Sequence, residues 1–438
     1  MEVLDLRSNN FSKTLDPLGM AKALRTARAW YAAVVLLAFH AAVLFLAVNL
    51  LAAWVLKAFP QDPVSLTYGE RSFAEVYPGW SREDVRRLLR ETWSRPGAFE
   101  PFTDWKEPPY EGRFVNVHPA GFRLSRGQGP WPPDPASLSV FVFGGSTAFG
   151  YGVADDETVA SHLQAFLSAR EPSVRCYNFG RGAYYSSQER ILFERLLVGG
   201  VVPRVAVFLD GLNEFIFDEP QFTAELERFV EAAVPAFASL LWRRLPLREL
   251  IAREKYRRPL KPARGRLARY DDPPRLDRLI ERYMGNRRTI TAVAAVWGVK
   301  PLFVWQPVPT YKYDLAHHLF GAYDFGLNTY SAFGYARMEE RLRGTGPAPD
   351  FLWAADMQQG LSEPLYVDQV HYTAAMSKRL GEEIGGALQR AILPGRDRPP
   401  THGDLALWRD HGGNPKTQLP QDGGDGDGGA RPRRGANR

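Results

Sequence analysis

The chain has almost no cysteine, with a single residue of this type, Cys176, among its 438. One cysteine excludes an intramolecular disulfide and a metal cluster held by thiolates. Cys176 falls in a predicted strand, so we interpret it as a small buried hydrophobic side chain. The sequence also has no His-x-x-x-His motif, no phosphate-binding glycine loop and no dinucleotide fingerprint. We therefore expect no metal and no cofactor.

The sequence has no internal repeats, and its net charge is modest at +6, with a pI of about 9.3. This balance suits contact with anionic surfaces but is not a nucleic-acid signature by itself. We expect no nucleic-acid partner. Hydrophobic residues make up 45% of the chain, which is enough for a sizeable core.

Residues 29–56 contain no charged residue, and as a helix they are long enough to cross a bilayer of about 30 Å. The run is too long for a signal peptide and lacks a small-residue cleavage site. We predict a transmembrane helix over 29–56 after an N-terminal segment, 1–28. Because Lys and Arg precede the helix, we expect a cytoplasmic N-terminus and a periplasmic or extracellular location for everything after Lys57.

Predicted strands alternate with predicted helices in the second half of the chain. Strands are expected near 138–143, 174–178, 204–209, 300–305 and 350–353, and helices near 157–169, 186–197, 275–297 and 373–391. This alternation predicts a parallel sheet with helices on both faces. The expected fold is therefore α/β, a flavodoxin-like three-layer α/β/α arrangement with five strands in the order 2-1-3-4-5.

The first predicted strand ends at Gly144-Gly145-Ser146. The glycines remove side chains where the strand stops, and Ser146 would stand at the carboxyl edge of the sheet, where open α/β sheets hold their sites. This stretch alone fits a structural Gly-Ser turn equally well.

Three further polar blocks follow predicted strands, in the order 177–183, 205–214 and 368–371. They contain Asn178 and Gly182, then Asn213, then Asp368 and His371. With Ser146, they resemble the four blocks of SGNH (GDSL-type) hydrolases of the membrane-anchored bacterial type, over roughly residues 138–390. The first block reads Gly145-Ser146-Thr147 here, where the family has Gly-Asp-Ser.

The resemblance implies a Ser-His-Asp acyl-enzyme mechanism with Ser146 as nucleophile, His371 as general base and Asp368 as the group that orients it. It also implies three oxyanion donors: the N–H of Ser146, the side-chain amide of Asn213 and a backbone N–H in the second block. We assign that N–H to Gly182, with Ala183 as the alternative.

A second Asp-x-x-His, from Asp314 to His317, follows the fourth strand. We prefer the later pair because it leads into a closing helix, as in the family. Segment 116–123 is expected to pack onto the active-site face, which leaves a catalytic role for His118 as an alternative. Asp210 and Glu214 flank Asn213 and are interpreted as structural.

The remaining regions complete the predicted organisation. Residues 57–136 form a packing region with a helix over 81–92 and an irregular stretch over 102–123, and residues 137–395 form the catalytic domain. This domain contains a basic helical insertion, 216–274, with an amphipathic helix over 222–242 followed by eleven Lys or Arg within 243–270. The insertion is a lid, a membrane-surface element or, as we prefer, an extra helical layer. Residues 396–438 are expected to be disordered.

The predicted function is that of a membrane-anchored serine esterase or O-acyltransferase. Its substrates would be acyl esters, for example acetyl esters, of envelope polysaccharide or lipid. Hydrolysis and transfer share the acyl-enzyme, so the sequence does not separate them. The alternatives are a non-catalytic envelope protein that binds glycan or acts as a scaffold on the same fold, and an α/β-hydrolase. The latter has Gly-x-Ser-x-Gly, whereas Ala148 stands at the last position here.

Overall fold

The structure is a computed structural model that describes residues 17–70, 73–95, 97–218, 242, 245–257, 262, 267–345 and 348–391. All of these belong to one unit by their contacts, Met1–Leu393. Several predictions fall outside the described residues: segment 1–16, the amphipathic helix apart from Trp242, residues 243–244, 258–261 and 263–266 of the basic run that follows it, and the tail 396–438.

The centre of this unit is a five-stranded parallel sheet with the order β6-β5-β7-β8-β9. Its strands are β5 (Leu138–Gly144), β6 (Val174–Asn178), β7 (Val205–Asp210), β8 (Lys300–Trp305) and β9 (Phe351–Trp353). In chain order this is 2-1-3-4-5, so the predicted α/β fold and its strand order are confirmed. The buried central strands read as continuous apolar runs, as strands covered on both faces do.

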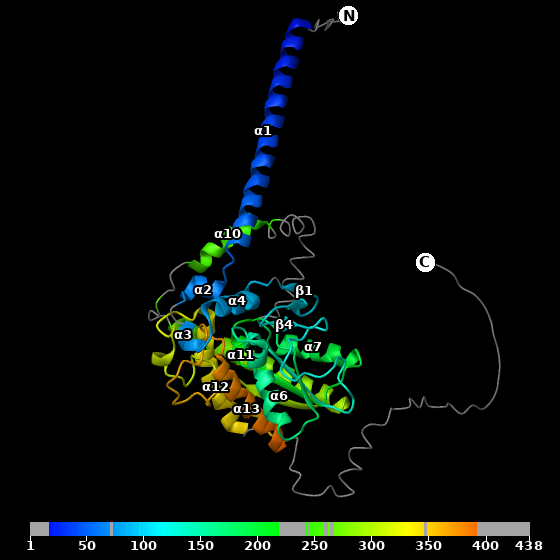
Figure 1. The fold of residues 1–438 in the computed structure, drawn as a ribbon, viewed down its shortest axis with the longest axis vertical. Coiled ribbons are helices and arrows are strands. Elements are labelled where there is room, and N and C mark those ends of the chain that lie inside the picture. Colours follow the sequence, from blue (N-terminus) through cyan, green and yellow to red (C-terminus); the bar gives the residue numbers. More distant parts are fainter. Residues whose placement is uncertain are drawn as a thin grey trace, which may run out of the picture. The chain divides into compact units, whose positions relative to one another are not determined.

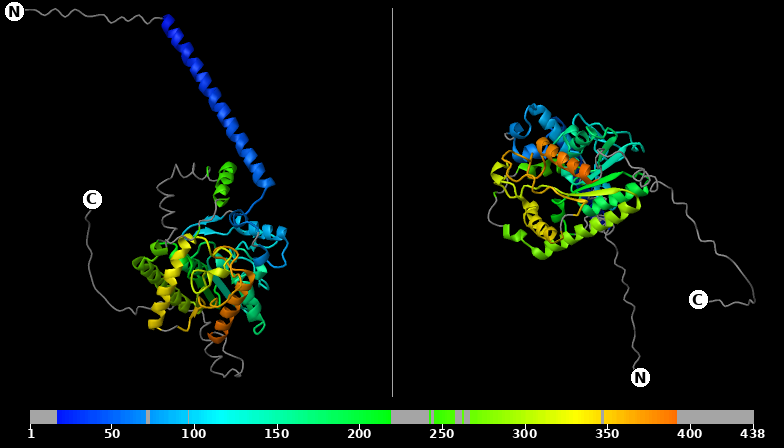
Figure 2. Two further views of the ribbon diagram at one scale, coloured as in Figure 1. Left: turned by 90° about the vertical axis from the view of Figure 1, so that its left-hand side faces the viewer. Right: turned by 90° about the horizontal axis from the view of Figure 1, so that it is seen from below.

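Helices cover both faces of the sheet (Figures 1 and 2). One face packs on α6 (Val159–Ser168) and α13 (Ala374–Ala391), and the other on α7 (Ser186–Val198), α11 (Pro273–Val296) and α12 (Tyr330–Thr345). Side chains alternate along a strand, so Val140 and Val142 of β5 join the first core, while Phe141 and Phe143 join the second. Helix α12 was not predicted from the sequence.

The segment between α1 and β5 packs against the sheet domain. It contains α2 (Pro63–Tyr68), α3 (Phe73–Val76), α4 (Arg82–Trp93), the hairpin of β1 (Ala98–Glu100) and β2 (Asp104–Lys106), and the hairpin of β3 (Tyr110–Glu111) and β4 (Asn116–Val117). As predicted, Ser81 caps α4, and its Oγ accepts from the N–H of Asp84 at 3.1 Å. The prediction of an irregular stretch over 102–123 was wrong, because it missed three of these short strands.

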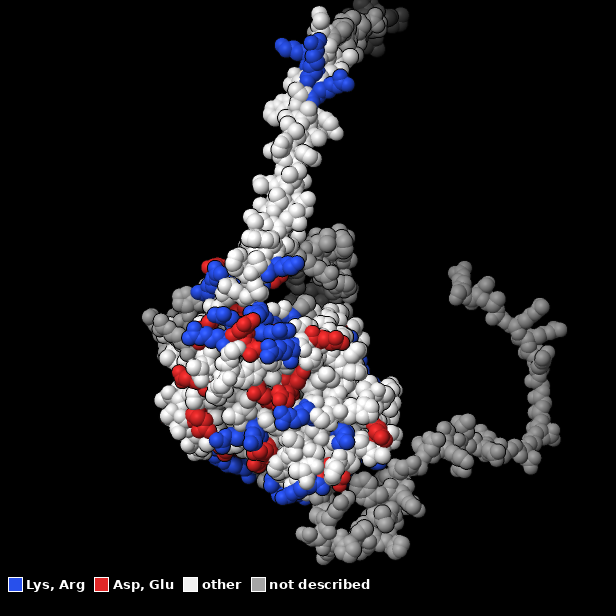
Figure 3. Space-filling view, in the orientation of Figure 1, with Lys and Arg blue, Asp and Glu red and all other residues white. Residues whose placement is uncertain are grey.

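Helix α1 (Pro17–Ala58) extends beyond the predicted span at both ends. Figure 3 shows Lys and Arg near its start and a long stretch without charge below them. Among the described residues, α1 is the one helix long and apolar enough to cross a membrane, with a mean hydropathy of 2.5. Its end contacts α10 (Pro246–Arg253), where the N–H of Leu247 donates to Asn49 Oδ1 at 3.2 Å.

Short helices complete the description. They are α5 (Ser146–Phe149) and the 3₁₀ helices η1 (Asp155–Glu157), η2 (Asn213–Phe215), η3 (Glu254–Arg257), η4 (Leu267–Tyr270), η5 (Leu315–His317) and η6 (Gly326–Thr329). Among these, α5 and η2 follow the ends of β5 and β7 after one and two intervening residues, at the carboxyl edge of the sheet.

Candidate active site

Ser146 begins α5 immediately after β5 ends. Gly144 has φ 155°, and a Cβ there would lie 2.5 Å from Ala148 Cβ and 3.0 Å from the carbonyl oxygen of Leu209. A Cβ on Gly145 would contact the side-chain nitrogen of Asn213. Both glycines are therefore required for the close turn that leads into α5. As the first residue of a helix, Ser146 has no intrahelical acceptor for its N–H.

Ser146, His371 and Asp368 form a hydrogen-bonded series with His371 in the middle. His371 Nε2 is 2.8 Å from Ser146 Oγ, and His371 Nδ1 is 2.7 Å from Asp368 Oδ2. The other oxygen of Asp368 accepts from the N–H groups of Val370 and His371 at 2.9 and 2.8 Å. A carboxylate beside Nδ1 favours the tautomer with a proton there, which leaves Nε2 free to accept the proton of Ser146.

Neighbouring groups stabilise the ionised form of Asp368. Burial raises the pKa of this carboxyl, but His371 and the N–H groups of Val370 and His371 outweigh that effect and lower it below the ordinary value. Asp368 is therefore ionised at neutral pH. An ionised Asp368 can orient the imidazole of His371 and stabilise it after it has accepted a proton.

Asn213 lies at the end of β7 beside the turn that carries Ser146. Its Nδ2 donates to the carbonyl oxygen of Tyr184 at 2.7 Å, and the same nitrogen lies close to the Cα of Gly145. Only one of its two amide hydrogens is used in the bond to Tyr184, because an amide carries two. The second is free to donate toward an oxyanion near Ser146.

Gly182 and Ala183 lie in one turn, which the N–H of Tyr184 closes by donating to the carbonyl oxygen of Arg181 at 3.3 Å. The N–H of Arg181 donates to the carbonyl oxygen of Gly144 at 2.9 Å, and this bond fixes the turn to the end of β5. Ala183 has φ 62°, a left-handed conformation that few non-glycine residues adopt. Both residues are thus brought to the edge of the sheet that carries Ser146, and the choice between their N–H groups stays a prediction.

Two aromatic rings that the sequence did not indicate contact His371. The ring of Tyr151 stacks on it at 5.3 Å, and that of Trp93 meets it edge-on at 5.6 Å. Tyr151 Oη donates to Glu107 at 3.0 Å, and Glu107 pairs with Arg95 at 3.0 Å. The region before β5 therefore supplies one wall of the site. No local pattern signalled this wall, because its members are far apart in the chain.

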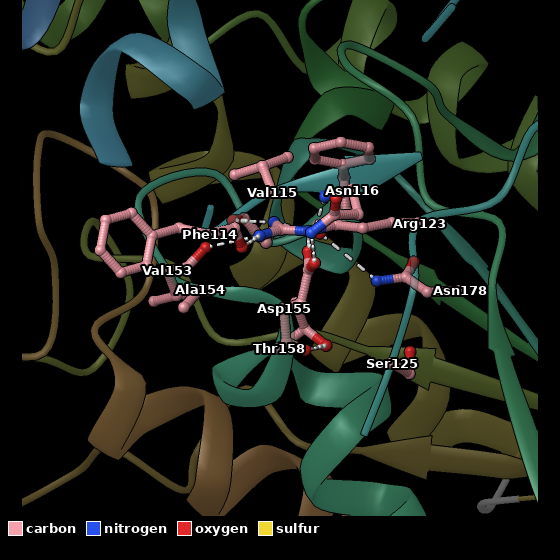
Figure 4. A network of polar contacts seen from close by, with 12 residues as sticks. Phe114, Val115, Asn116, Arg123, Ser125, Val153, Ala154, Asp155, Thr158 and Asn178 are labelled. Carbon is pink, nitrogen blue, oxygen red and sulfur yellow. Dashed lines mark hydrogen bonds and ion pairs between the residues drawn. The ribbon is translucent and has the colours of Figure 1, made fainter. Parts of the chain in front are cut away.

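Arg123 supports the helix that carries Ser146. Figure 4 shows the side chain of Arg123 within a network of polar contacts that includes Asp155 and Val153. Its guanidinium is fully buried and donates to the carbonyl oxygens of Phe149, Gly150 and Val153 at 2.9, 2.6 and 2.7 Å. It also pairs with Asp155 at 2.8 Å. Burial lowers the pKa of Arg123 and Asp155 opposes that effect. Because Phe149 and Gly150 end α5, Arg123 caps this helix, as expected of a segment that packs onto the site.

The alternative base, His118, is engaged elsewhere. Its ring stacks on that of Phe122 at 4.6 Å, and its Nδ1 accepts from the N–H of Ala120 at 3.0 Å. These contacts close the turn that precedes Arg123. The ring of His118 therefore has a structural explanation within its own segment.

The second Asp-x-x-His lies on the surface. His317 Nε2 is 3.8 Å from Asp314 Oδ2, and their side chains are 39% and 67% exposed. The next residue, His318, is buried, and its Nε2 lies 3.2 Å from the carbonyl oxygen of Gln369. Burial lowers the pKa of His318 to about 4. His318 thus supports the loop that carries Asp368, a role that the sequence gave no reason to expect.

Three interacting carboxyl groups are buried near the end of β7 and on α7, on Glu189, Asp210 and Glu214. Glu214 accepts from the N–H of Ser186 at 2.6 Å and lies 3.5 Å from Arg282. Burial raises the pKa of Glu189 and Asp210 well above the usual carboxyl range, and the negative charge of Glu214 adds to this. These contacts fit the structural interpretation of Asp210 and Glu214. Among the described residues, no group of three His, Cys, Asp or Glu side chains could hold a metal.

No protein-family model matches this chain, and no curated protein sequence matches it either. Solved structures with similarity to it include the lipase Lip_vut3 from a goat rumen metagenome, at 14% identity, covering 57% of this chain and 97% of the other, with a TM-score of 0.34. The psychrotrophic esterase EstA from Pseudoalteromonas sp. has 10% identity, coverages of 58% and 98% and a TM-score of 0.32. A member of the lipolytic protein G-D-S-L family from Veillonella parvula has 11% identity, coverages of 59% and 100% and a TM-score of 0.30.

Proposed function

We propose that this chain is a membrane-anchored serine hydrolase of the SGNH (GDSL) type that cleaves or transfers acyl esters. The observation that carries the proposal is the pair of hydrogen bonds from Ser146 through His371 to Asp368, at 2.8 and 2.7 Å. A serine with a base in reach, and a carboxylate behind the base, is the arrangement that makes a hydroxyl nucleophilic.

The proposed reaction begins when Ser146 Oγ attacks the acyl carbonyl and its proton passes to His371 Nε2. The N–H of Ser146, that of Gly182 and the amide of Asn213 receive the negative oxygen of the tetrahedral intermediate. The ester C–O bond then breaks, and His371 returns the proton to the departing alcohol. Water or a second alcohol next attacks the acyl-serine and gives its proton to His371. The bond from the acyl group to Ser146 Oγ then breaks, His371 returns the proton to Oγ, and an acid or a new ester is released.

The position of Asp368 and His371 favours this type over an α/β-hydrolase. Both stand on one short turn. Asp368 Oδ2 lies 2.7 Å from Nδ1 of the His371 ring, and Asp368 Oδ1 accepts from the backbone N–H of His371 at 2.8 Å. In an α/β-hydrolase the acid and the histidine usually lie on separate loops. The short turn thus supports the assignment that the four sequence blocks suggested.

The proposed location follows from α1. Almost none of its apolar surface is buried in the protein, and uncovered apolar surface of this length is stable in a bilayer. With Lys22, Arg25 and Arg28 before the apolar stretch, the N-terminus is cytoplasmic and the sheet domain lies outside. A catalytic domain tied to the outer face of a membrane acts on esters of envelope polysaccharide or lipid, for example acetyl esters.

The test is ester hydrolysis by the detergent-solubilised full chain, with p-nitrophenyl acetate as substrate, for the wild type beside Ser146→Ala. We expect kcat to fall by a factor of about 10⁴ or more in the variant, because the acyl-enzyme cannot form. Circular dichroism establishes that the variant is folded. Equal turnover by the two proteins would overturn the proposal, and addition of an alcohol acceptor measures transfer against hydrolysis.

A further inference from the structure

The hairpin of β1 and β2 has its aromatic side chains facing outward. Phe99 stands directly across from Trp105, and their rings lie 6.3 Å apart. Phe99, Phe102 and Trp105 are 49%, 60% and 45% exposed. Phe102 stands in the turn with φ 69°, a conformation unfavourable for a non-glycine residue, so the fold holds a large aromatic ring in solvent at a cost. Exposed apolar patches of this kind mark interaction surfaces.

The inner side of the same hairpin is charged. Glu100 is buried and pairs with the buried Arg181 at 2.6 Å, while Thr103 Oγ donates to Glu100 at 2.8 Å. Gln188 of α7 donates to the carbonyl oxygen of Thr103 at 3.0 Å. A hairpin usually turns its apolar side chains inward. Here the pattern is inverted, and the ionic contacts fix the aromatic face in its outward position.

Two partly exposed cations lie beside this face. Lys106 Nζ and Arg195 Nη1 are each 3.3 Å from Glu100, and their side chains are 40% and 47% exposed. Glu100 is thus shared among Arg181, Lys106 and Arg195. Aromatic rings with Lys and Arg beside them are the composition that binds the interface of an anionic bilayer, with rings at the acyl boundary and cations at the headgroups.

The hairpin is also close to the membrane anchor along the chain. Helix α1 ends at Ala58, α2 begins at Pro63 and contacts α4, and β1 starts soon after α4 ends (Figure 1). A domain held at its anchor by so short a connection stays within reach of the bilayer.

We infer that the hairpin of β1 and β2 docks on the bilayer that α1 crosses. Phe99, Phe102 and Trp105 enter the boundary between headgroups and acyl chains, and Lys106 and Arg195 contact anionic headgroups. This inference rests on the anchoring role of α1 proposed above. Since Arg181 adjoins Gly182, docking would hold the candidate active site beside the membrane surface and give esters in that layer the shortest path to Ser146.

The experiment places a nitroxide label on the full chain in nanodiscs of phosphatidylethanolamine and phosphatidylglycerol. Cys176 is fully buried, so a new cysteine in Phe102→Cys is labelled selectively. The matched control is Lys378→Cys on α13, whose side chain is 60% exposed and which covers the other face of the sheet from α7. Collision rates with oxygen, which concentrates in lipid, and with a water-soluble nickel chelate report the location of each label.

We expect the label at position 102 to favour oxygen over the nickel chelate by several-fold and the label at 378 to favour the chelate. The same preference for the chelate at both positions would overturn the inference. In phosphatidylcholine nanodiscs the oxygen preference at 102 should weaken, and an unchanged preference would remove the role of Lys106 and Arg195. Fluorophosphonate labelling of Ser146 in the same samples reports the proposed function independently of where the hairpin lies.

Discussion

Asp368 is the residue whose role can be tested with the smallest change of shape. In Asp368→Asn, an amide beside His371 Nδ1 can donate to the ring, which favours the tautomer that cannot accept a proton from Ser146. We expect kcat for ester hydrolysis to fall by a factor of about 10⁴, with the fold unchanged by circular dichroism. A decrease of less than tenfold would contradict the assignment of Asp368 as the orienting group.

Replacement of Asn213 should weaken stabilisation of the transition state, and so lower kcat, more than it weakens substrate binding. Loss of one oxyanion donor typically lowers kcat by a factor of about 10² to 10³, and we expect this for Asn213→Ala with little change in KM. The variant also loses the bond to Tyr184, so its melting temperature is measured in parallel. A folded variant with a raised KM and an unchanged kcat would place Asn213 in substrate binding instead.

Site residues that belong to short local motifs could be predicted from the sequence. Site residues that contact the motifs only through the tertiary fold could not. Ser146, Asp368 and His371 each stand in a short pattern after a strand, and the structure brings all three together. Trp93 and Tyr151 contact His371 only because α4 folds onto the sheet domain. A contact between residues so far apart leaves no periodicity or spacing in the sequence.

At the scale of elements, Arg123 joins α5 to the segments around it. Arg123→Met would remove the cation that pairs with Asp155 and the side-chain donor to the buried carbonyl oxygens of Gly150 and Val153. Removing one partner from a buried ion pair costs about 3–5 kcal/mol, so we expect a loss of this size in the free energy of unfolding, measured with urea. The matched control is Arg126→Met, which breaks an exposed pair with Asp156. Equal stability of the two variants would contradict the capping role of Arg123.

The buried acids at the end of β7 and on α7 predict a dependence of stability on pH. The folded state raises the pKa of Asp210 and Glu189, so their contribution is fully present below the pKa of the unfolded chain, about 4, and is lost as pH rises toward the folded value. Between pH 5 and 8, the free energy of unfolding should therefore fall less steeply in Asp210→Asn than in the wild type. Parallel pH profiles in urea unfolding would contradict this.

The sequence predicted the elements that carry a clear apolar pattern and missed those that do not. All five strands of the parallel sheet were predicted because each is an apolar run between turn signals. Helix α12 was missed, and it contains Gly334, which weakens a helical pattern. The structure explains this glycine, because a Cβ there would collide with the ring of Phe215. Strands β2 to β4 were missed because each has only two or three residues and none contains an apolar run.

At the scale of the whole molecule, the region before the sheet and the sheet domain share one core. Phe149 and Val367 of the sheet domain pack in the same cluster as Val85, Leu88 and Val115. The sequence predicted a boundary near residue 136 from composition. Composition cannot reveal a core shared between two such regions, because that core exists only after they have packed together.

The proposed topology makes a prediction for intact cells. Cysteines introduced by Thr26→Cys at the start of α1 and by Lys378→Cys on α13 should lie on opposite sides of the membrane. A membrane-impermeant maleimide should label position 378 in spheroplasts and position 26 only after permeabilisation. Burial raises the pKa of Cys176, so the native thiol stays unreactive. Labelling of both positions before permeabilisation would contradict the proposed topology.

The most direct measurement is labelling of the full chain in detergent with a fluorophosphonate, for the wild type beside Ser146→Ala. The reagent reacts with a serine only where a neighbouring base makes it nucleophilic. We expect one labelled peptide, containing Ser146, in the wild type and none in the variant. A folded wild-type protein that takes up no label, or a variant labelled to the same extent, would contradict the claim that Ser146, His371 and Asp368 form a working nucleophile.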